Sequence, residues 1–173
     1  GVVIASPIGT HFEYALKSLK SKKHVFIEKP ISTTKKQGQT LLTIARKNNL
    51  EIFVGHIFLY HPVLSKLKKL MKKEKISSIY LGWHRFGPFK EKISLDLLSH
   101  YIIILKEFFN QPKKLIIKSK IGCVTNCDIL SLHVKFQKKV NCVIEINRVS
   151  YHKQREIIIK SDKNLYKWED DIL

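Results

Sequence analysis

The stretch HVFIEKPISTT, residues His24 to Thr34, decides how the first part of this chain folds. Its apolar centre, Val25 to Ile27, is β-branched and aromatic, which favours a strand. Pro30 lacks an N–H and ends that strand, and the hydroxyl residues 32–34 offer N-caps to the helical pattern KKQGQTLLTIARKNN. Lys29 is therefore predicted at the carboxyl end of a strand, where open α/β sheets place their chemistry. We also predict a cis Lys29–Pro30 peptide bond, since it would turn the lysine toward that edge.

The same order of elements is repeated on both sides of this stretch. VVIA runs into SPIGTH and then into the helical pattern HFEYALKSLKS, and a third strand is predicted at EIFVG. Successive strand–loop–helix units form βαβ crossovers, which give a parallel sheet. Residues 1–55 are thus predicted to form half of a doubly wound sheet. The 173 residues contain no G-x-G-x-x-G, so the turn that cradles a cofactor's phosphates has no counterpart in them.

Two helices and one long strand are predicted after Gly55. HPVLSKLKKLMKKEK has apolar residues on one helical face, and ISSIYLGWHRF is typical of a strand. SLDLLSHYIIILKEFF predicts a helix on which Asp96 and His100, at i and i+4, project from one face. A carboxylate so placed can orient an imidazole, and an imidazole exchanges a proton near neutral pH. On spacing alone an ordinary surface i,i+4 pair is the favoured interpretation, and a catalytic pair is the alternative.

The last third of the chain is rich in strand-forming residues. Alternation in SLHVKF and CVIEI predicts half-buried antiparallel strands, with a hairpin turn at Gln137 to Lys139, in a meander with one covered face. Cys123, Cys127 and Cys142 lack the spacing of a zinc site, so we expect reduced thiols and no metal.

Composition limits the classes of function. A formal net charge of +18 points toward nucleic acid, yet 28 of the 32 basic residues are scattered lysines, whereas specific phosphate and base contacts favour arginine. A nucleic-acid partner is therefore disfavoured. No apolar run approaches the ~20 residues of a membrane span, and VVIA lacks the flanks of a secretory signal. We expect no membrane association and a cytoplasmic location.

Four motifs, in order, make this chain resemble the Gfo/Idh/MocA family of NAD(P)-dependent sugar oxidoreductases, which includes glucose-fructose oxidoreductase and inositol dehydrogenase. They are A-S-P-x-x-T-H at Ala5 to His11, E-K-P at Glu28 to Pro30, V-G-H at Val54 to His56, and D-x-x-x-H at Asp96 to His100. The resemblance implies an α/β fold in two domains. Residues 1–55 would be the C-terminal half of a Rossmann-type parallel sheet. Residues 56–173 would be an α+β substrate and oligomerisation domain with a mainly antiparallel, open-faced sheet.

Family members carry the glycine-rich turn upstream of the A-S-P segment and continue past the final acidic stretch, so we expect this chain to be a fragment of such a protein. The resemblance implies that His100 is the general acid/base, that Asp96 orients it, and that Lys29 donates to the reacting oxygen. The implied cofactor-side residues are Ser6, Pro7, His11, Glu28, Lys29 and Pro30. The implied substrate-side residues are Lys29, Tyr60, Arg85 and His100.

Structural roles remain open for several of these residues. Ser6 and His11 could serve as the N-cap and a first-turn residue of a helix, and Glu28 with Lys29 as a surface pair. Tyr60 and His61 could cap the helix that begins at Pro62.

The implied activity is hydride transfer between NAD or NADP and a hydroxyl of a sugar, polyol or nucleotide-linked sugar, in a protein that self-associates through its antiparallel sheet. GHIFLYHP and WHRFGP resemble members that act on nucleotide-linked amino sugars, and Arg85 would suit a phosphate or carboxylate. The alternatives are a catalytically silent fragment or scaffold that retains the fold, and a basic nucleic-acid-binding protein.

Overall fold

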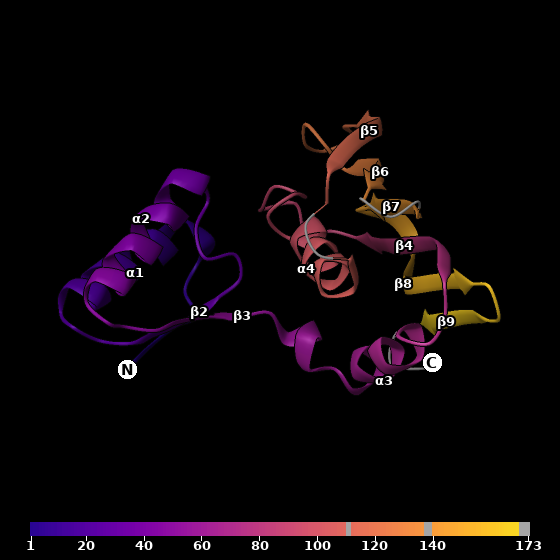
Figure 1. Cartoon of the computed structure of the whole chain (residues 1–173). Helices are drawn as coiled ribbons and strands as arrows, with labels where there is room; N and C mark the ends of the chain where they lie inside the picture. The colour runs from indigo at the N-terminus through magenta and orange to yellow at the C-terminus, as the bar shows by residue number, and fades with distance from the viewer. Residues whose placement is uncertain (110–111, 137–139, 170–173) are drawn as a thin grey trace. The chain divides into compact units, whose positions relative to one another are not determined.

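The chain divides after Ile57 into two compact units, Gly1–Ile57 and Phe58–Leu173, in a computed structural model that describes residues 1–109, 112–136 and 140–169 (Figure 1). The division falls close to the boundary expected after residue 55. The hairpin turn predicted at Gln137 to Lys139 lies outside the described residues.

Three parallel strands form the sheet of the first unit, in the order β1-β2-β3. Its elements in chain order are β1 (Val2–Ile4), the short 3-10 helix η1 (Ile8–Thr10), α1 (His11–Lys20), β2 (Val25–Glu28), α2 (Lys35–Lys47) and β3 (Ile52–Gly55). Ile4, Ile27 and Val54 are adjacent in register, so the carboxyl ends of the three strands lie at one edge. The parallel half-sheet predicted from the sequence is confirmed.

Helix packing and one cap explain why these segments fold as they do. Thr34 caps α2, its hydroxyl accepting the backbone N–H of Gln37 at 3.3 Å. Both helices bury one apolar face, and α1 and α2 lie side by side in Figure 1. The buried core consists of Ile4, Ala15, Leu19, Val25, Ile27, Leu41 and Ala45. The Lys29–Pro30 peptide bond that follows β2 is cis, as predicted, and so is Gly87–Pro88 in the second unit.

A six-stranded sheet in the order β5-β6-β7-β4-β8-β9 dominates the second unit. The helices are η2 (Ile57–Tyr60, which begins at the last residue of the first unit), α3 (Pro62–Met71) and α4 (Leu97–Phe109). The strands are β4 (Ile76–Phe86), β5 (Lys114–Ile121), β6 (Ile129–Lys135), β7 (Asn141–Asn147), β8 (Val149–Ser161) and β9 (Leu165–Glu169).

The expected meander is interrupted at one place. Strand β4 lies between β7 and β8, parallel to β7 and antiparallel to β8, so these two consecutive strands do not pair with each other. The other strand pairs of this sheet are antiparallel, which makes it mixed but mainly antiparallel. Strand alternation predicts which residues are buried, but it carries no information about which strand is the neighbour, and this is why the prediction was wrong here.

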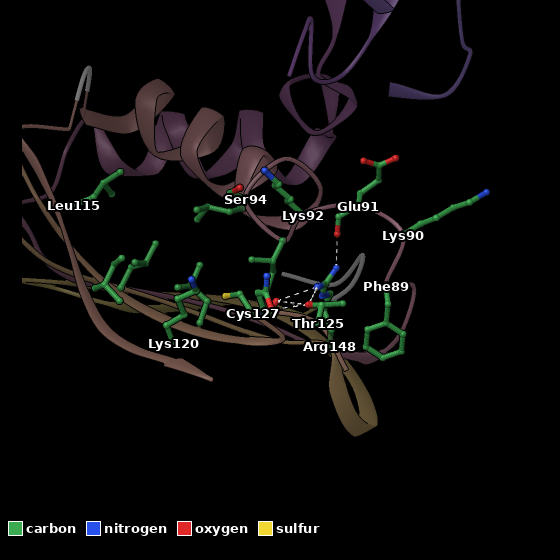
Figure 2. A pocket seen from close by; sticks show the side chains of 16 residues that line it. Phe89, Lys90, Glu91, Lys92, Ser94, Leu115, Lys120, Thr125, Cys127 and Arg148 are labelled. Carbon is green, nitrogen blue, oxygen red and sulfur yellow. Dashed lines mark hydrogen bonds between the residues drawn. The ribbon is translucent and has the colours of Figure 1, made fainter. Parts of the chain in front are cut away.

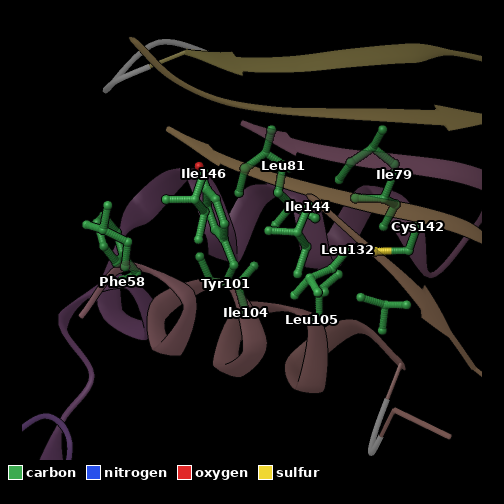
Figure 3. Close-up of a cluster of buried hydrophobic side chains, with 14 of the residues drawn as sticks. Phe58, Ile79, Leu81, Tyr101, Ile104, Leu105, Leu132, Cys142, Ile144 and Ile146 are labelled. Atoms are coloured by element: carbon green, nitrogen blue, oxygen red, sulfur yellow. The ribbon is translucent and has the colours of Figure 1, made fainter. Parts of the chain in front are cut away.

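Helix α4 covers one face of this sheet. Figure 3 shows Tyr101, Ile104 and Leu105 directed from the helix toward Leu132, Ile144 and Ile146 on the strands. The other face carries polar residues: the Tyr80 hydroxyl donates to Glu145 at 2.8 Å, and Lys167 pairs with Glu156 at 3.3 Å. Gly82 is required beside Tyr80, because a Cβ there would lie 2.9 Å from the tyrosine ring. The sheet therefore has one apolar, covered face and one polar face.

A buried ion pair fixes the loops at one end of the sheet. Arg148, between β7 and β8, is 1% exposed and donates to Asp128 at 3.0 Å. Burial opposes the ionisation of Asp128, but its carboxylate accepts the Thr125 hydroxyl and the backbone N–H groups of Thr125, Cys123 and Val124. These hydrogen bonds outweigh burial and hold the pKa of Asp128 below its ordinary value.

We expect Asp128→Asn to lower the free energy of unfolding by about 3 kcal/mol near neutral pH, because it leaves the buried Arg148 without its counter-charge. Since the folded-state pKa of Asp128 is depressed, its stabilisation is complete above about pH 4 and is lost as the pH falls below that value. The difference between wild type and variant should therefore narrow at about pH 3 in urea denaturation. Asp162→Asn, at an exposed carboxylate, is the control. The prediction would be contradicted if wild type and Asp128→Asn differed in free energy of unfolding by the same amount near neutral pH and at about pH 3.

Candidate functional site

The carboxyl edge of the first sheet gathers three loops that carry predicted site residues. Ser6 follows β1, Lys29 and Pro30 follow β2, and His56 follows β3. The parallel register aligns Glu28 with Gly55, and the Glu28 carboxylate lies so close that a Cβ on Gly55 would be 3.1 Å from Oε1. A side chain at position 55 would therefore press on the Glu28 carboxylate, which lies against the glycine.

His11 joins two of these loops. Its ring is 2% exposed, with Nδ1 2.8 Å from the Pro30 carbonyl oxygen and Nε2 2.9 Å from the Ser6 carbonyl oxygen. A carbonyl oxygen can only accept, so the ring donates to Pro30 or to Ser6 according to which nitrogen carries the hydrogen. The Ser6 hydroxyl lies 2.6 Å from that of Thr10, in the turn before α1. The structural interpretation of His11 is therefore realised in the fold, while its role toward a cofactor stays a prediction.

His100 lies among aromatic rings in the second unit. It is on α4, is 7% exposed, and its ring centroid lies 4.9 Å from that of Phe58 and 5.6 Å from that of Trp83. Burial in an apolar setting limits the access of bulk water to the imidazole. This is the environment of a histidine positioned by packing, which differs from that of an exposed surface residue.

The structure corrects the placement of Asp96. The helix was expected to contain this residue, but α4 begins at Leu97, and Asp96 lies in the preceding turn, where its N–H donates to the Lys92 carbonyl at 3.0 Å. Aspartate favours such positions because its side chain competes with the helical hydrogen bonds. Its carboxylate accepts Arg85 Nη2 at 3.0 Å, and both side chains are largely buried. Sequence spacing suggested the histidine partner but gave no sign of the arginine.

Arg85 also lies over the Trp83 ring, 5.8 Å from its centroid, so Asp96, Arg85, Trp83 and His100 form one continuous set of contacts. Arg155, which sequence reasoning overlooked, is the residue of β8 that pairs with Trp83 of β4. Its guanidinium carbon lies 4.8 Å from the Phe58 ring centroid. Its only sequence signal was its type, an arginine in a lysine-rich chain.

The remaining residues have simpler surroundings. Tyr60 ends η2 and is 69% exposed, and His61 caps α3 by accepting the backbone N–H of Val63 at 3.2 Å. The cysteines are free thiols, and burial raises the pKa of Cys142 to about 12. Among the described residues, no three His, Cys, Asp or Glu side chains gather in a way that could hold a metal ion. Within the same described part of the chain, no helix has both the length and the apolar character needed to cross a membrane.

Comparison with known proteins identifies the family. Residues 1–56 match the model of the oxidoreductase family with an NAD-binding Rossmann fold, GFO_IDH_MocA. Residues 1–56 thus carry the sequence of the Gfo/Idh/MocA oxidoreductase family. It is 28% identical over 126 residues to scyllo-inositol 2-dehydrogenase (NADP(+)) IolW of Bacillus subtilis, a match that covers 65% of this chain and 35% of that enzyme.

Two solved structures show the same fold over nearly the whole chain. UDP-N-acetylglucosamine 3-dehydrogenase GnnA of Acidithiobacillus ferrooxidans has a TM-score of 0.88 at 20% identity, covering 97% of this chain and 57% of that one. The WlbA dehydrogenase of Bordetella pertussis, in complex with NADH and UDP-GlcNAcA, has a TM-score of 0.87 at 16% identity, covering 98% and 55%. The chain thus spans about half the length of these relatives. The predicted α/β fold class is confirmed, and the family model supports the predicted resemblance over residues 1–56.

We expect His11→Ala to destabilise the first unit by about 2 kcal/mol, because two partly buried carbonyl groups lose their ring-nitrogen partner. His11→Gln, whose amide nitrogen donates twice, should recover part of the loss. Hydrogen exchange of the β1 and β2 amides measures it. Glu13→Ala changes an exposed residue in the first turn of the same helix and is the control. If Glu13→Ala and His11→Ala had the same small effect, the His11 contacts between the two loops would not contribute to stability.

Proposed function

We propose that this chain provides the substrate side and the nicotinamide side of an enzyme that transfers a hydride between NAD or NADP and a hydroxyl of a sugar, polyol or nucleotide-linked sugar. The observation that carries the proposal is the sheet edge in residues 1–57. There the Ser6, Lys29 and His56 loops come together, within the residues that match the NAD-binding family model. Open α/β sheets bind ligands at this edge.

The residues of the first unit fit part of a nicotinamide cofactor. The strand ends offer backbone and hydroxyl groups at Ser6, an ammonium group at Lys29, and a close backbone approach at Gly55. The glycine turn that receives a pyrophosphate is absent from the sequence. These loops, with Pro7 and Pro30, would therefore hold the nicotinamide half. The cofactor, when bound, supplies the hydride acceptor or donor.

The protein's own side chains accept and return the proton of the reacting hydroxyl. His100 accepts the proton of the reacting hydroxyl in the oxidising direction and returns it in the reverse direction. Lys29 donates a hydrogen bond to the same oxygen and stabilises negative charge that develops on it. Asp96, held by its ion pair with Arg85, places a negative charge just before the start of α4, one helical turn before His100.

Nucleotide-linked sugars are the substrates we favour. Arg85 and Arg155 place two guanidinium groups around Trp83, near His100, and guanidinium groups are suited to phosphate or carboxylate. Tyr60 is exposed at the end of η2 and is available to contact a sugar. Self-association through the polar face of the six-stranded sheet is part of the same proposal.

We expect the 173-residue chain by itself to bind NAD and NADP weakly, because pyrophosphate recognition depends on a glycine turn and a helix N-terminus that these residues lack. Isothermal titration calorimetry with each dinucleotide measures the affinity. Dissociation constants in the micromolar range would contradict this expectation. If binding is weak as expected, fusion of a βαβ segment with a G-x-G-x-x-G turn ahead of Gly1 should increase the affinity for the dinucleotide.

In that fusion protein, we expect Lys29→Met and His100→Asn each to lower kcat by about 10² to 10⁴, with little change in cofactor affinity. Asp96→Asn should have a smaller effect, since the imidazole remains. NAD(P)H absorbance with a panel of sugars, polyols and UDP-sugars gives the rates.

The matched controls for these variants are Lys36→Met and His152→Asn, both at exposed positions. Urea denaturation of each variant separates a catalytic loss from a loss of the folded state. Wild-type rates in both Lys29→Met and His100→Asn would refute the assigned roles, and no activity with any of the sugars would refute the proposed function.

A further inference from the structure

A cavity of about 710 Å³ opens in the second unit beside α4 (Figure 2). Its walls are the connection from β4 to α4 at residues 89–94, the edge strand β5, and the loop that joins β5 to β6. Leu98 of α4 lines it and stands about 200° around the helix from His100, so the cavity lies on the side of α4 away from that histidine. The volume is typical of sites for small organic molecules.

The floor of the cavity is apolar and incompletely covered. Leu115 and Ile117 on β5 are 47% and 61% exposed, next to Leu130 and Leu132 of β6, which are buried. Strand β5 is the edge of the sheet, so no further strand covers these side chains in the described part of the chain. Covering such apolar side chains on a concave surface with an apolar ligand removes them from water, which favours binding.

Positive charge predominates around this apolar floor. Lys90, Lys92 and Lys120 line the cavity, and Glu91 is the one acidic residue among the described lining residues. Figure 2 shows the Lys120 side chain rising from the strand toward the space beneath α4, whereas the side chains of Lys90 and Glu91 extend away from it. Arg148 also lines the cavity, but Asp128 neutralises it. The cavity therefore favours a negatively charged occupant.

The walls of the cavity are held in place without a ligand. Arg148 donates through Nη1 to the Glu91 carbonyl at 2.6 Å and through Nη2 to the Cys127 carbonyl at 3.0 Å. One buried guanidinium thus ties together the two loops that form opposite walls. A site that is already formed loses little conformational entropy on binding.

We propose that this cavity binds a small amphipathic carboxylate, with its apolar chain against Leu115 and Ile117 and its carboxylate between Lys92 and Lys120. The site is separate from the proposed dehydrogenase residues, and it does not depend on hydride transfer.

The cysteines provide the test. Cys127 lines the cavity, whereas Cys123 is exposed in the same loop. Burial raises the pKa of the Cys127 thiol, so iodoacetamide alkylation is followed by mass spectrometry at alkaline pH. We expect octanoate to slow the alkylation of Cys127 about fivefold or more and to leave the alkylation rate of Cys123 unchanged. The uncharged 1-octanol should need a severalfold higher concentration for the same protection.

Lys92→Gln and Lys120→Gln should each weaken octanoate protection about three- to tenfold, as expected for one charge-assisted contact. Lys118→Gln, on the same strand but outside the cavity, is the matched control and should leave protection unchanged. Leu115→Trp should fill the floor and abolish the effect of octanoate. Methyl signals of Leu115 and Ile117 in an NMR titration provide a second measurement that needs no variant.

Three results would overturn the proposal. Unchanged Cys127 alkylation and unchanged methyl signals at saturating octanoate would show that the cavity does not bind it. Equal protection by 1-octanol would show an apolar patch without a role for the lysines. Protection by UDP-N-acetylglucosamine but not by octanoate would assign the cavity to a nucleotide-sugar site.

Discussion

The second unit depends on one buried charge, the Arg148 guanidinium. It pairs with Asp128 and donates to carbonyl groups from two loops, and the pair is nearly inaccessible to water. Removing either partner would leave an uncompensated charge in a medium of low dielectric, so the loops can hardly rearrange independently. The β4–α4 connection that ends at Asp96 is one of these loops. The ion pair thus anchors the connection that leads into α4, the helix that carries His100.

The first unit uses one histidine side chain for a comparable purpose. His11 ties the loop after β1 to the loop after β2, with one ring nitrogen on each carbonyl. In both units, a side chain with separated nitrogen atoms joins loops that are far apart in sequence. Such a group costs less conformational entropy than two independent contacts, because a single residue is ordered for both. Lys29, one of the proposed reacting groups, directly precedes Pro30, whose carbonyl oxygen contacts the His11 ring.

The prevalence of lysine hid the most informative residues. Three of the four arginines have defined partners: Arg85 pairs with Asp96, Arg148 with Asp128, and Arg155 stacks on Phe58. A planar guanidinium can make several directed hydrogen bonds and stack on a ring, whereas an ammonium group is a strongly hydrated point charge. In a chain where most basic residues are lysine, these three arginines were therefore readable signals of specific contacts, which composition alone did not exploit.

Local pattern determined the elements of this protein. The HVFIEKPISTT stretch predicted β2, the turn with its cis proline and the start of α2, because strand propensity, proline and hydroxyl caps act over a few residues. The ordered motifs predicted the family. Only the tertiary structure decided that β4 separates β7 from β8, that Asp96 pairs with Arg85, and that Arg148 closes one wall of a cavity. These are contacts between residues distant in sequence, and periodicity encodes which side of an element is buried but not what covers it.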